Sequence, residues 1–156
     1  LDGLFEKLYE AEAPVEAKII EQSIWAVWLE TPSPTVELLM SNGVEAMQVQ
    51  DFAKALSFFN VVTEFSPDYA EGWNKRATLH FMMGNYAASR ADIARTLELE
   101  PRHFGALGGL ATILETEGDE AGALKALERA VSANPHIPGA KQKLRVLTRK
   151  VKGDPI

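Results

Sequence analysis

An internal repeat of 34 residues constrains the fold of this chain more than any other feature. Pro67, Pro101 and Pro135 are separated by 34 residues, and the segments before them repeat in phase. Small residues recur at equivalent positions (Gly43, Ala77 and Ala111; Ala55, Ser89 and Ala123), as do large apolar residues (Leu39, Trp73 and Leu107; Phe59, Ile93 and Leu127). This period is typical of helical hairpins that stack side by side. The sequence therefore predicts a scaffold with a concave face, which points to binding rather than catalysis.

The expected helices follow from apolar spacing, prolines and turn residues. Two helices precede the repeats, over 3–12 and 14–29. The three hairpins are expected over 34–49 with 52–65, 69–83 with 86–99, and 103–117 with 120–133. Tight turns fall at 50–51, 84–85 and 118–119, where Gly suits a left-handed helix end and Asn or Asp caps the next helix. A last helix over about 139–152 has one apolar and one basic face, which suits a solubilising cap. We expect one domain with no strand.

Composition excludes several function classes. A chain of 156 residues can form a continuous core, and its 46% apolar and 24% charged residues are ordinary for a soluble globular protein. No apolar run approaches the ~18 residues of a membrane span. The net charge of −6 argues against nucleic acid as the main partner. Without cysteine there is no disulfide framework and no thiolate metal site.

Charge is unevenly distributed along the chain. Residues 141–156 carry six Lys or Arg and one Asp, a net charge of +5, whereas the remaining 140 residues carry −11. One interpretation is a solvated cap helix that offsets an acidic body. The other is a basic handle for an acidic partner or for anionic lipid.

The repeating residues resemble those of tetratricopeptide repeat (TPR) proteins over about 36–152. The second and third repeats carry the pattern (Trp73, Ala77, Gly84, Tyr86, Ser89, Ile93 and Pro101; Leu107, Leu110, Ala111, Gly118, Ala123, Leu127, Ala130 and Pro135). The first repeat departs from it at Gln50 and Val62. The resemblance implies an all-α, right-handed superhelix, or α-solenoid. Its expected parts are an N-terminal helical pair (1–33), three repeats (34–67, 68–101 and 102–135) and a capping helix (137–152).

Two segments, 69–77 and 33–40, are similar to small TPR proteins of the alphaproteobacterial envelope. That resemblance implies a periplasmic or envelope-associated location, with the cytoplasm as the alternative. Because the first residue is Leu1 and not Met, we expect that a leader has been removed.

In this family the first helix of each hairpin lines a concave groove that holds a peptide or a partner helix. Matched by position, the groove would be lined by Met40, Val44, Met47, Glu71, Asn74, Lys75, Thr78, Phe81, Met82, Gly105, Gly108, Gly109 and Thr112, with Glu37, Ser41 and Glu115 beside them. Members that bind chaperones grip a carboxylate with lysines, an arginine and asparagines. Here Met40, Val44, Gly105 and Gly109 occupy most of those positions, and Lys75 stands where the clamp has asparagine. We therefore expect no carboxylate clamp.

Several of these residues have a second interpretation. Met40, Val44 and Met47 share one helix face and can be core, a groove for an apolar helix, or a homodimer interface. Glycines cost roughly 1 kcal/mol each inside a helix, so the three glycines at 105–109 allow either a close neighbouring helix or a bulky partner side chain. Trp25 and Trp28 either close the N-terminal end of the core or fold across the groove.

Catalytic chemistry is not indicated. The sequence has no nucleophile elbow, phosphate loop or HExxH motif, and His80, His103 and His136 fall at packing or junction positions. We expect a non-enzymatic scaffold or adaptor that needs no cofactor or metal and binds a protein or peptide partner. The alternatives are a self-assembling structural protein, as a homodimer or by end-to-end stacking, and a module for a small molecule or lipid.

Overall fold

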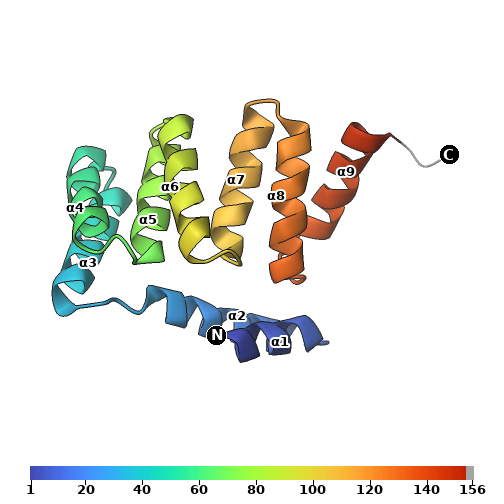
Figure 1. Cartoon of the computed structure of the whole chain (residues 1–156), viewed down its shortest axis with the longest axis horizontal. Helices are drawn as coiled ribbons and strands as arrows, with labels where there is room; N and C mark the ends of the chain where they lie inside the picture. Colours follow the sequence, from blue (N-terminus) through green and yellow to red (C-terminus); the bar gives the residue numbers. More distant parts are fainter. Residues whose placement is uncertain (154–156) are drawn as a thin grey trace. The chain divides into compact units, whose positions relative to one another are not determined.

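The structure is a computed structural model that describes residues 1–153. Within that range all regular structure is helical (Figure 1), so the all-α prediction is confirmed. The elements are α1 (Asp2–Glu10), α2 (Pro14–Leu29), α3 (Pro34–Gln48), α4 (Phe52–Phe65), α5 (Ala70–Met82), α6 (Tyr86–Leu99), α7 (Phe104–Thr116), α8 (Glu120–Ala133) and α9 (Ala140–Lys152). No described helix is both long enough and apolar enough to cross a bilayer.

The helices begin where capping side chains satisfy free backbone N–H groups. Ser33 Oγ accepts from the Val36 N–H at 3.2 Å, ahead of Pro34 in the first turn of α3. Asp51, Asn85 and Asp119 cap α4, α6 and α8 in the same way. The preceding residue in each hairpin turn has a positive φ: Gly84 and Gly118 in two turns, and Gln50, at 61°, in the first. Gln50 therefore adopts the left-handed conformation although it lacks the freedom of glycine.

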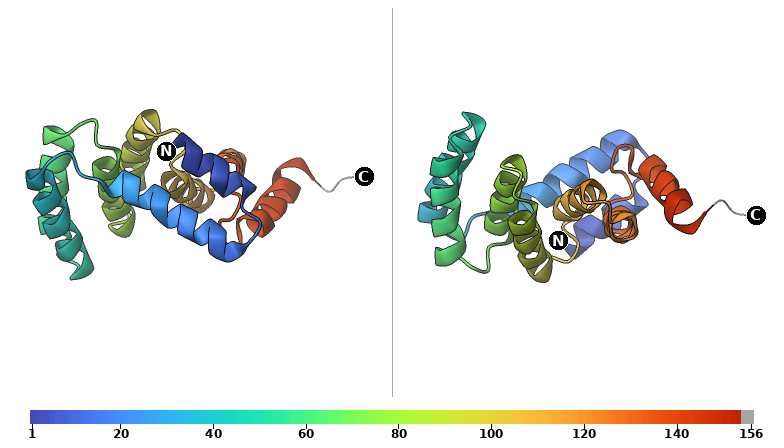
Figure 2. Two further views of the ribbon diagram at one scale, coloured as in Figure 1. Left: turned by 90° about the horizontal axis from the view of Figure 1, so that it is seen from below. Right: turned by 90° about the horizontal axis from the view of Figure 1, so that it is seen from above.

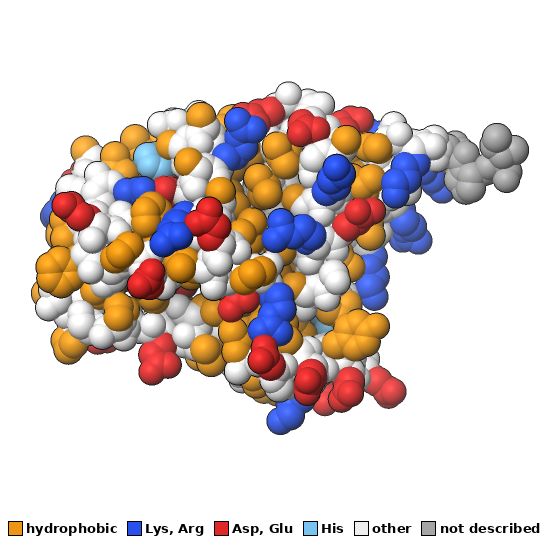
Figure 3. Space-filling view, viewed as in Figure 1, with side chains coloured by type: hydrophobic (Ala, Val, Ile, Leu, Met, Phe, Trp, Pro, Cys, Tyr) orange, Lys and Arg blue, Asp and Glu red, His pale blue; other side chains and the backbone are white. Residues whose placement is uncertain are grey.

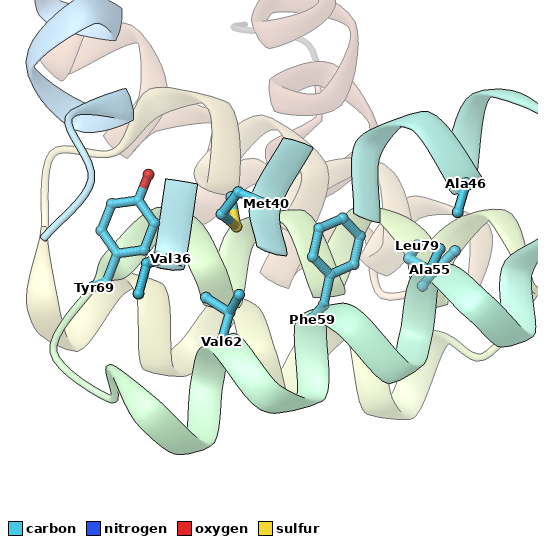
Figure 4. Packing of buried hydrophobic residues seen from close by; sticks show 8 residues of the cluster. All are labelled: Val36, Met40, Ala46, Ala55, Phe59, Val62, Tyr69 and Leu79. Carbon is cyan, nitrogen blue, oxygen red and sulfur yellow. The ribbon is translucent and has the colours of Figure 1, made fainter. Parts of the chain in front are cut away.

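Residues 29–101 form one compact unit, called here the central unit. Its core gathers side chains from α3, α4, α5 and the residue before α5 (Figure 4). It consists of Val36, Met40, Ala46, Ala55, Phe59, Val62, Tyr69 and Leu79. Gly43 lets α3 and α4 approach closely, because a Cβ at this position would lie 2.5 Å from the Phe59 ring.

A partly buried polar network joins α4, α5 and α6 in the central unit. The Arg76 guanidinium donates to both carboxylate oxygens of Asp92, at 2.8 and 2.7 Å. It also donates to Asn60 Oδ1 at 3.0 Å and to Thr63 Oγ1 at 2.9 Å, and it lies over the Trp73 ring. Bidentate pairing of this kind fixes geometry as well as adding energy. Sequence reasoning missed this network, because its members sit at different places in three helices.

Residues 1–28 and 102–153 belong to the other unit, called here the terminal unit. Its α7–α8 hairpin packs against α9 through Ala123, Leu124, Leu127, Ala140 and Leu147. Helices α1 and α2 lie side by side (Figure 2) across the end of the hairpin at which α7 begins. There Phe5, Leu8, Ile24 and Trp28 cluster with Phe104, flanked by Ala133 and Ile137.

The interpretation that Trp25 and Trp28 close the N-terminal end of the repeat core is wrong. Both rings pack against the start of the third repeat: Trp28 stacks on His103 with a centroid distance of 4.1 Å, and Trp25 meets Phe104 edge-on at 5.8 Å. The apolar spacing of α2 could not indicate this partner, because it shows which face is buried but not against which helix.

Polar contacts also fasten α1 and α2 to the hairpin end. The His136 ring Nε2 lies 3.0 Å from the Leu8 carbonyl oxygen, and Asn134 Nδ2 donates to Glu21 Oε2 at 3.1 Å. Arg102 pairs with Asp2 at 2.5 Å. These contacts join residues at least 100 positions apart in the sequence.

The basic helix α9 is partly neutralised by the hairpin on which it packs. Lys143 pairs with Glu115 at 2.5 Å, Lys150 with Glu120 at 2.9 Å, and Lys152 lies 3.7 Å from Glu128. Lys and Arg side chains gather visibly on this helix (Figure 3). The pairing favours the interpretation of a solvated cap over that of a free basic handle. Asp154, counted in the charge of this segment, lies outside the described residues.

Candidate binding site on the central unit

A hollow of about 590 Å³ lies over α3 in the central unit. It is lined by one face of α3, by the stretch of chain before that helix, by the residue before α5, and by α5 itself. The lining residues are Leu29, Thr31, Glu37, Met40, Ser41, Val44, Glu45, Gln48, Tyr69 and Lys75. All of them lie within the central unit.

The α3 face has an apolar floor and a polar rim. Its lining residues recur every three or four positions, which brings them onto one side of the helix. Met40 is only 6% exposed and also belongs to the core, and Val44 is half-buried against the same core. Glu37 and Glu45 are exposed at the edge. The hollow thus offers apolar contact flanked by carboxylates.

On α5, the polar groups next to the hollow are engaged with one another. Glu71 is fully buried and accepts from Asn74 Nδ2 at 2.8 Å. Lys75 Nζ lies 4.0 Å from the other Glu71 carboxylate oxygen. The Tyr69 hydroxyl donates to the Leu29 carbonyl at 3.2 Å, and burial, with a smaller contribution from the Glu71 charge, raises the pKa of Tyr69 to about 12. This tyrosine therefore stays neutral and holds the segment before α3 in place.

The structure brings together only part of the residue set predicted for the first two repeats. Lys75 reaches the hollow with Met40 and Val44, whereas Met47 packs against the core. Glu71 and Asn74 are buried, and the Thr78 hydroxyl donates back to the Asn74 carbonyl.

Phe81 and Met82 are exposed near the end of α5 and do not line the hollow. Phe81 packs on Tyr86, with ring centroids 5.5 Å apart. Sequence reasoning missed Leu29, Thr31, Glu45, Gln48 and Tyr69. Nothing in the spacing of Leu29 and Thr31 indicates that the segment before α3 turns back to this helix.

The predicted residues of the third repeat lie on α7, in the terminal unit. Gly105 is the point of close approach for α2: a Cβ there would lie 2.8 Å from the Trp25 ring. At Gly108 a Cβ would meet nothing within 4 Å among the described residues. Gly109 is half-buried and Thr112 is exposed. That these residues share one groove with those of the first two repeats stays a prediction.

The two glycines predict opposite effects of the same substitution. We expect Gly105→Ala to lower the free energy of unfolding by about 1–3 kcal/mol, because the added methyl collides with a ring held in an aromatic cluster. We expect Gly108→Ala to raise it by roughly 1 kcal/mol, through helix propensity alone. Urea denaturation followed by circular dichroism measures both. Equal effects would contradict the close contact between α2 and α7.

The three histidines take part in packing, helix capping or hydrogen bonding. His103 is buried and its Nδ1 accepts the Ala106 N–H at 3.1 Å, so it caps α7. Burial lowers the pKa of His80, opposed by the nearby Asp92 carboxylate. No group of three or more His, Asp or Glu side chains arranged to hold a metal ion occurs within residues 1–153.

Comparison with known proteins agrees with the repeat and the hairpin geometry. The family profile described as tetratricopeptide repeat matches residues 74–136. A TPR repeat-containing protein of Rhizobium etli is 40% identical over 154 residues, which is 99% of this chain and 76% of that protein.

Two solved structures show the same fold at low sequence identity. The first TPR of Spaghetti (RPAP3), bound to the HSP90 peptide SRMEEVD, has a TM-score of 0.71 and 16% identity, over 78% of this chain and 97% of that one. The type III secretion chaperone SycD of Yersinia enterocolitica, in complex with a peptide of the translocator YopD, has a TM-score of 0.70 and 17% identity, with the same coverage. Together with the 34-residue hairpins and the Rhizobium relative, these likenesses show that the chain belongs to the tetratricopeptide repeat family.

Proposed function

We propose that this protein is a non-enzymatic scaffold that binds a peptide or partner helix in the hollow over α3. The observation that carries the proposal is the lining of that hollow. Met40 and Val44 supply apolar contact on the first helix of a repeat, beside exposed polar groups that can orient a ligand. Concave sites with an apolar floor and a few polar groups are the usual form of ligand sites, and an amphipathic helix docks by laying its apolar face into such a groove.

Two solved structures of similar fold support peptide binding as the kind of function. The Spaghetti and SycD structures both hold peptides, so the same hairpin architecture serves peptide binding in proteins that share less than a fifth of their sequence with this chain. Fold alone does not carry function, and the residues of the hollow must therefore carry the assignment.

The test is a selection of binding peptides from a random library displayed on phage, with the full chain as bait. We expect Val44→Asp to raise the dissociation constant of the selected peptides at least about tenfold, which corresponds to roughly 1.4 kcal/mol. The reason is that the substitution places a charge on the apolar floor. Fluorescence anisotropy with labelled peptide measures the dissociation constant.

The matched control is Leu38→Asp. Leu38 is 62% exposed on the same helix and does not line the hollow, so this variant should bind as the unchanged chain does. If both variants weakened peptide binding equally, or if neither weakened it, the hollow would not be the binding site. Far-ultraviolet circular dichroism confirms that each variant keeps its helices.

A further inference from the structure

We infer that the partner segment is cationic: a peptide in which apolar side chains that enter the hollow are flanked by Lys or Arg. This inference rests on the proposed function and names the chemistry of the ligand. It starts from the direction in which the polar groups around the hollow point.

Lys75, the cation among the lining residues of the hollow, lies near a carboxylate of its own helix. Lys75 Nζ lies 4.0 Å from the Glu71 carboxylate one turn earlier, and that carboxylate is fully buried. The Glu71 charge partly offsets that of Lys75, which makes Lys75 a weaker attractant for an anionic ligand than a lysine without a carboxylate neighbour would be.

Two further donors, Tyr69 at the hollow and Asn74 beside Lys75 on α5, are also engaged within the protein. The Asn74 amide donates to Glu71 at 2.8 Å, and the Tyr69 hydroxyl donates to the Leu29 carbonyl at 3.2 Å. A site for a carboxylate needs donors that point toward the ligand. Here these donors point into the protein.

The carboxylates of the rim, in contrast, are exposed. Glu37 and Glu45 are exposed two turns apart on the α3 face that lines the hollow. Between them lie Met40 and Val44, which are buried and half-buried. The two rim carboxylates outnumber the one cation of the lining, Lys75, so the charge around the apolar floor favours a cationic ligand over an anionic one. The rim therefore matches Lys or Arg side chains placed about two helical turns apart, with apolar residues between them.

The inferred ligand differs in charge from the peptide in a related structure. The peptide bound by the first TPR of Spaghetti, SRMEEVD, carries three acidic residues and one arginine.

The phage selection with the full chain tests the inference through the charge of the enriched peptides. We expect their net charge to be positive, and we expect a labelled peptide from this set to bind about tenfold more weakly to Glu45→Lys. Glu64→Lys is the matched control: it makes the same charge change on an exposed residue near the end of α4, outside the hollow. It should change the dissociation constant less than about twofold, and affinity for the unchanged chain should fall as salt rises.

The outcomes separate the two claims. Acidic or neutral peptides that lose binding in Val44→Asp would overturn the cationic partner while leaving the hollow as the binding site. Equal effects of Glu45→Lys and Glu64→Lys would also overturn it, because the attraction would then come from net charge alone. No enrichment, or enriched peptides indifferent to Val44→Asp, would remove both the cationic partner and the proposed function.

Discussion

Replacing Arg76 with alanine is expected to lower the free energy of unfolding by about 3–5 kcal/mol. The Asp92 carboxylate is buried, with 6% of its side chain exposed, and Arg76 meets both of its oxygens. Removing the guanidinium leaves a buried charge without its main counter-ion and takes a donor from Asn60 and Thr63. Urea denaturation monitored by circular dichroism measures the loss.

A double substitution separates two contributions to the free energy of unfolding: the cost of leaving a buried charge unpaired, and the net contribution of the ion pair itself. Arg76→Met combined with Asp92→Leu removes both charges and keeps apolar volume at the junction of α4, α5 and α6. We expect this variant to be clearly more stable than Arg76→Ala, because buried ion pairs are often replaced by apolar residues at little cost. If Arg76→Ala alone cost less than about 1 kcal/mol, the network would contribute no more to stability than a solvent-exposed ion pair does.

Replacing Trp28 with alanine is expected to cost about 3–5 kcal/mol, which is typical of a large core aromatic. Trp28 is 7% exposed, stacks on His103, and meets Phe104 at 4.9 Å and Phe5 at 6.0 Å. Its loss leaves a cavity at the point where α2 reaches the start of α7. We also expect faster amide hydrogen exchange in α1 and α2, because this cluster holds them against the hairpin.

The control for Trp28 is Val15→Ala, on the same helix. Val15 is 72% exposed, so its truncation should change stability by no more than about 0.5 kcal/mol. Denaturant unfolding and hydrogen exchange compare the two variants directly. A small effect of Trp28→Ala, with α1 and α2 still protected from exchange, would mean that the aromatic cluster does not hold the N-terminal pair.

The predictable part of the candidate binding site is the part that follows from helical spacing. Met40 and Val44 could be assigned to a groove face because helical spacing fixes which side of α3 they share. The resemblance to the TPR family assigned Asn74 and Lys75 to partner binding, but both interact with the buried Glu71. A repeat pattern gives the position of a side chain on its helix. It does not show which donor is already engaged by a neighbour.

The sequence by itself determined the helices and their pairing into hairpins. The 34-residue period, the capping residues Ser33, Asp51, Asn85 and Asp119, and the turn glycines are local signals that act within a few residues. Only the tertiary structure decided which helices the N-terminal pair meets and that the segment before α3 folds back to line the hollow. Those outcomes depend on contacts between residues far apart in the chain, such as Trp28 with His103 and Tyr69 with Leu29. Apolar burial is non-directional, so an apolar face in the sequence specifies that it must be covered but not by what.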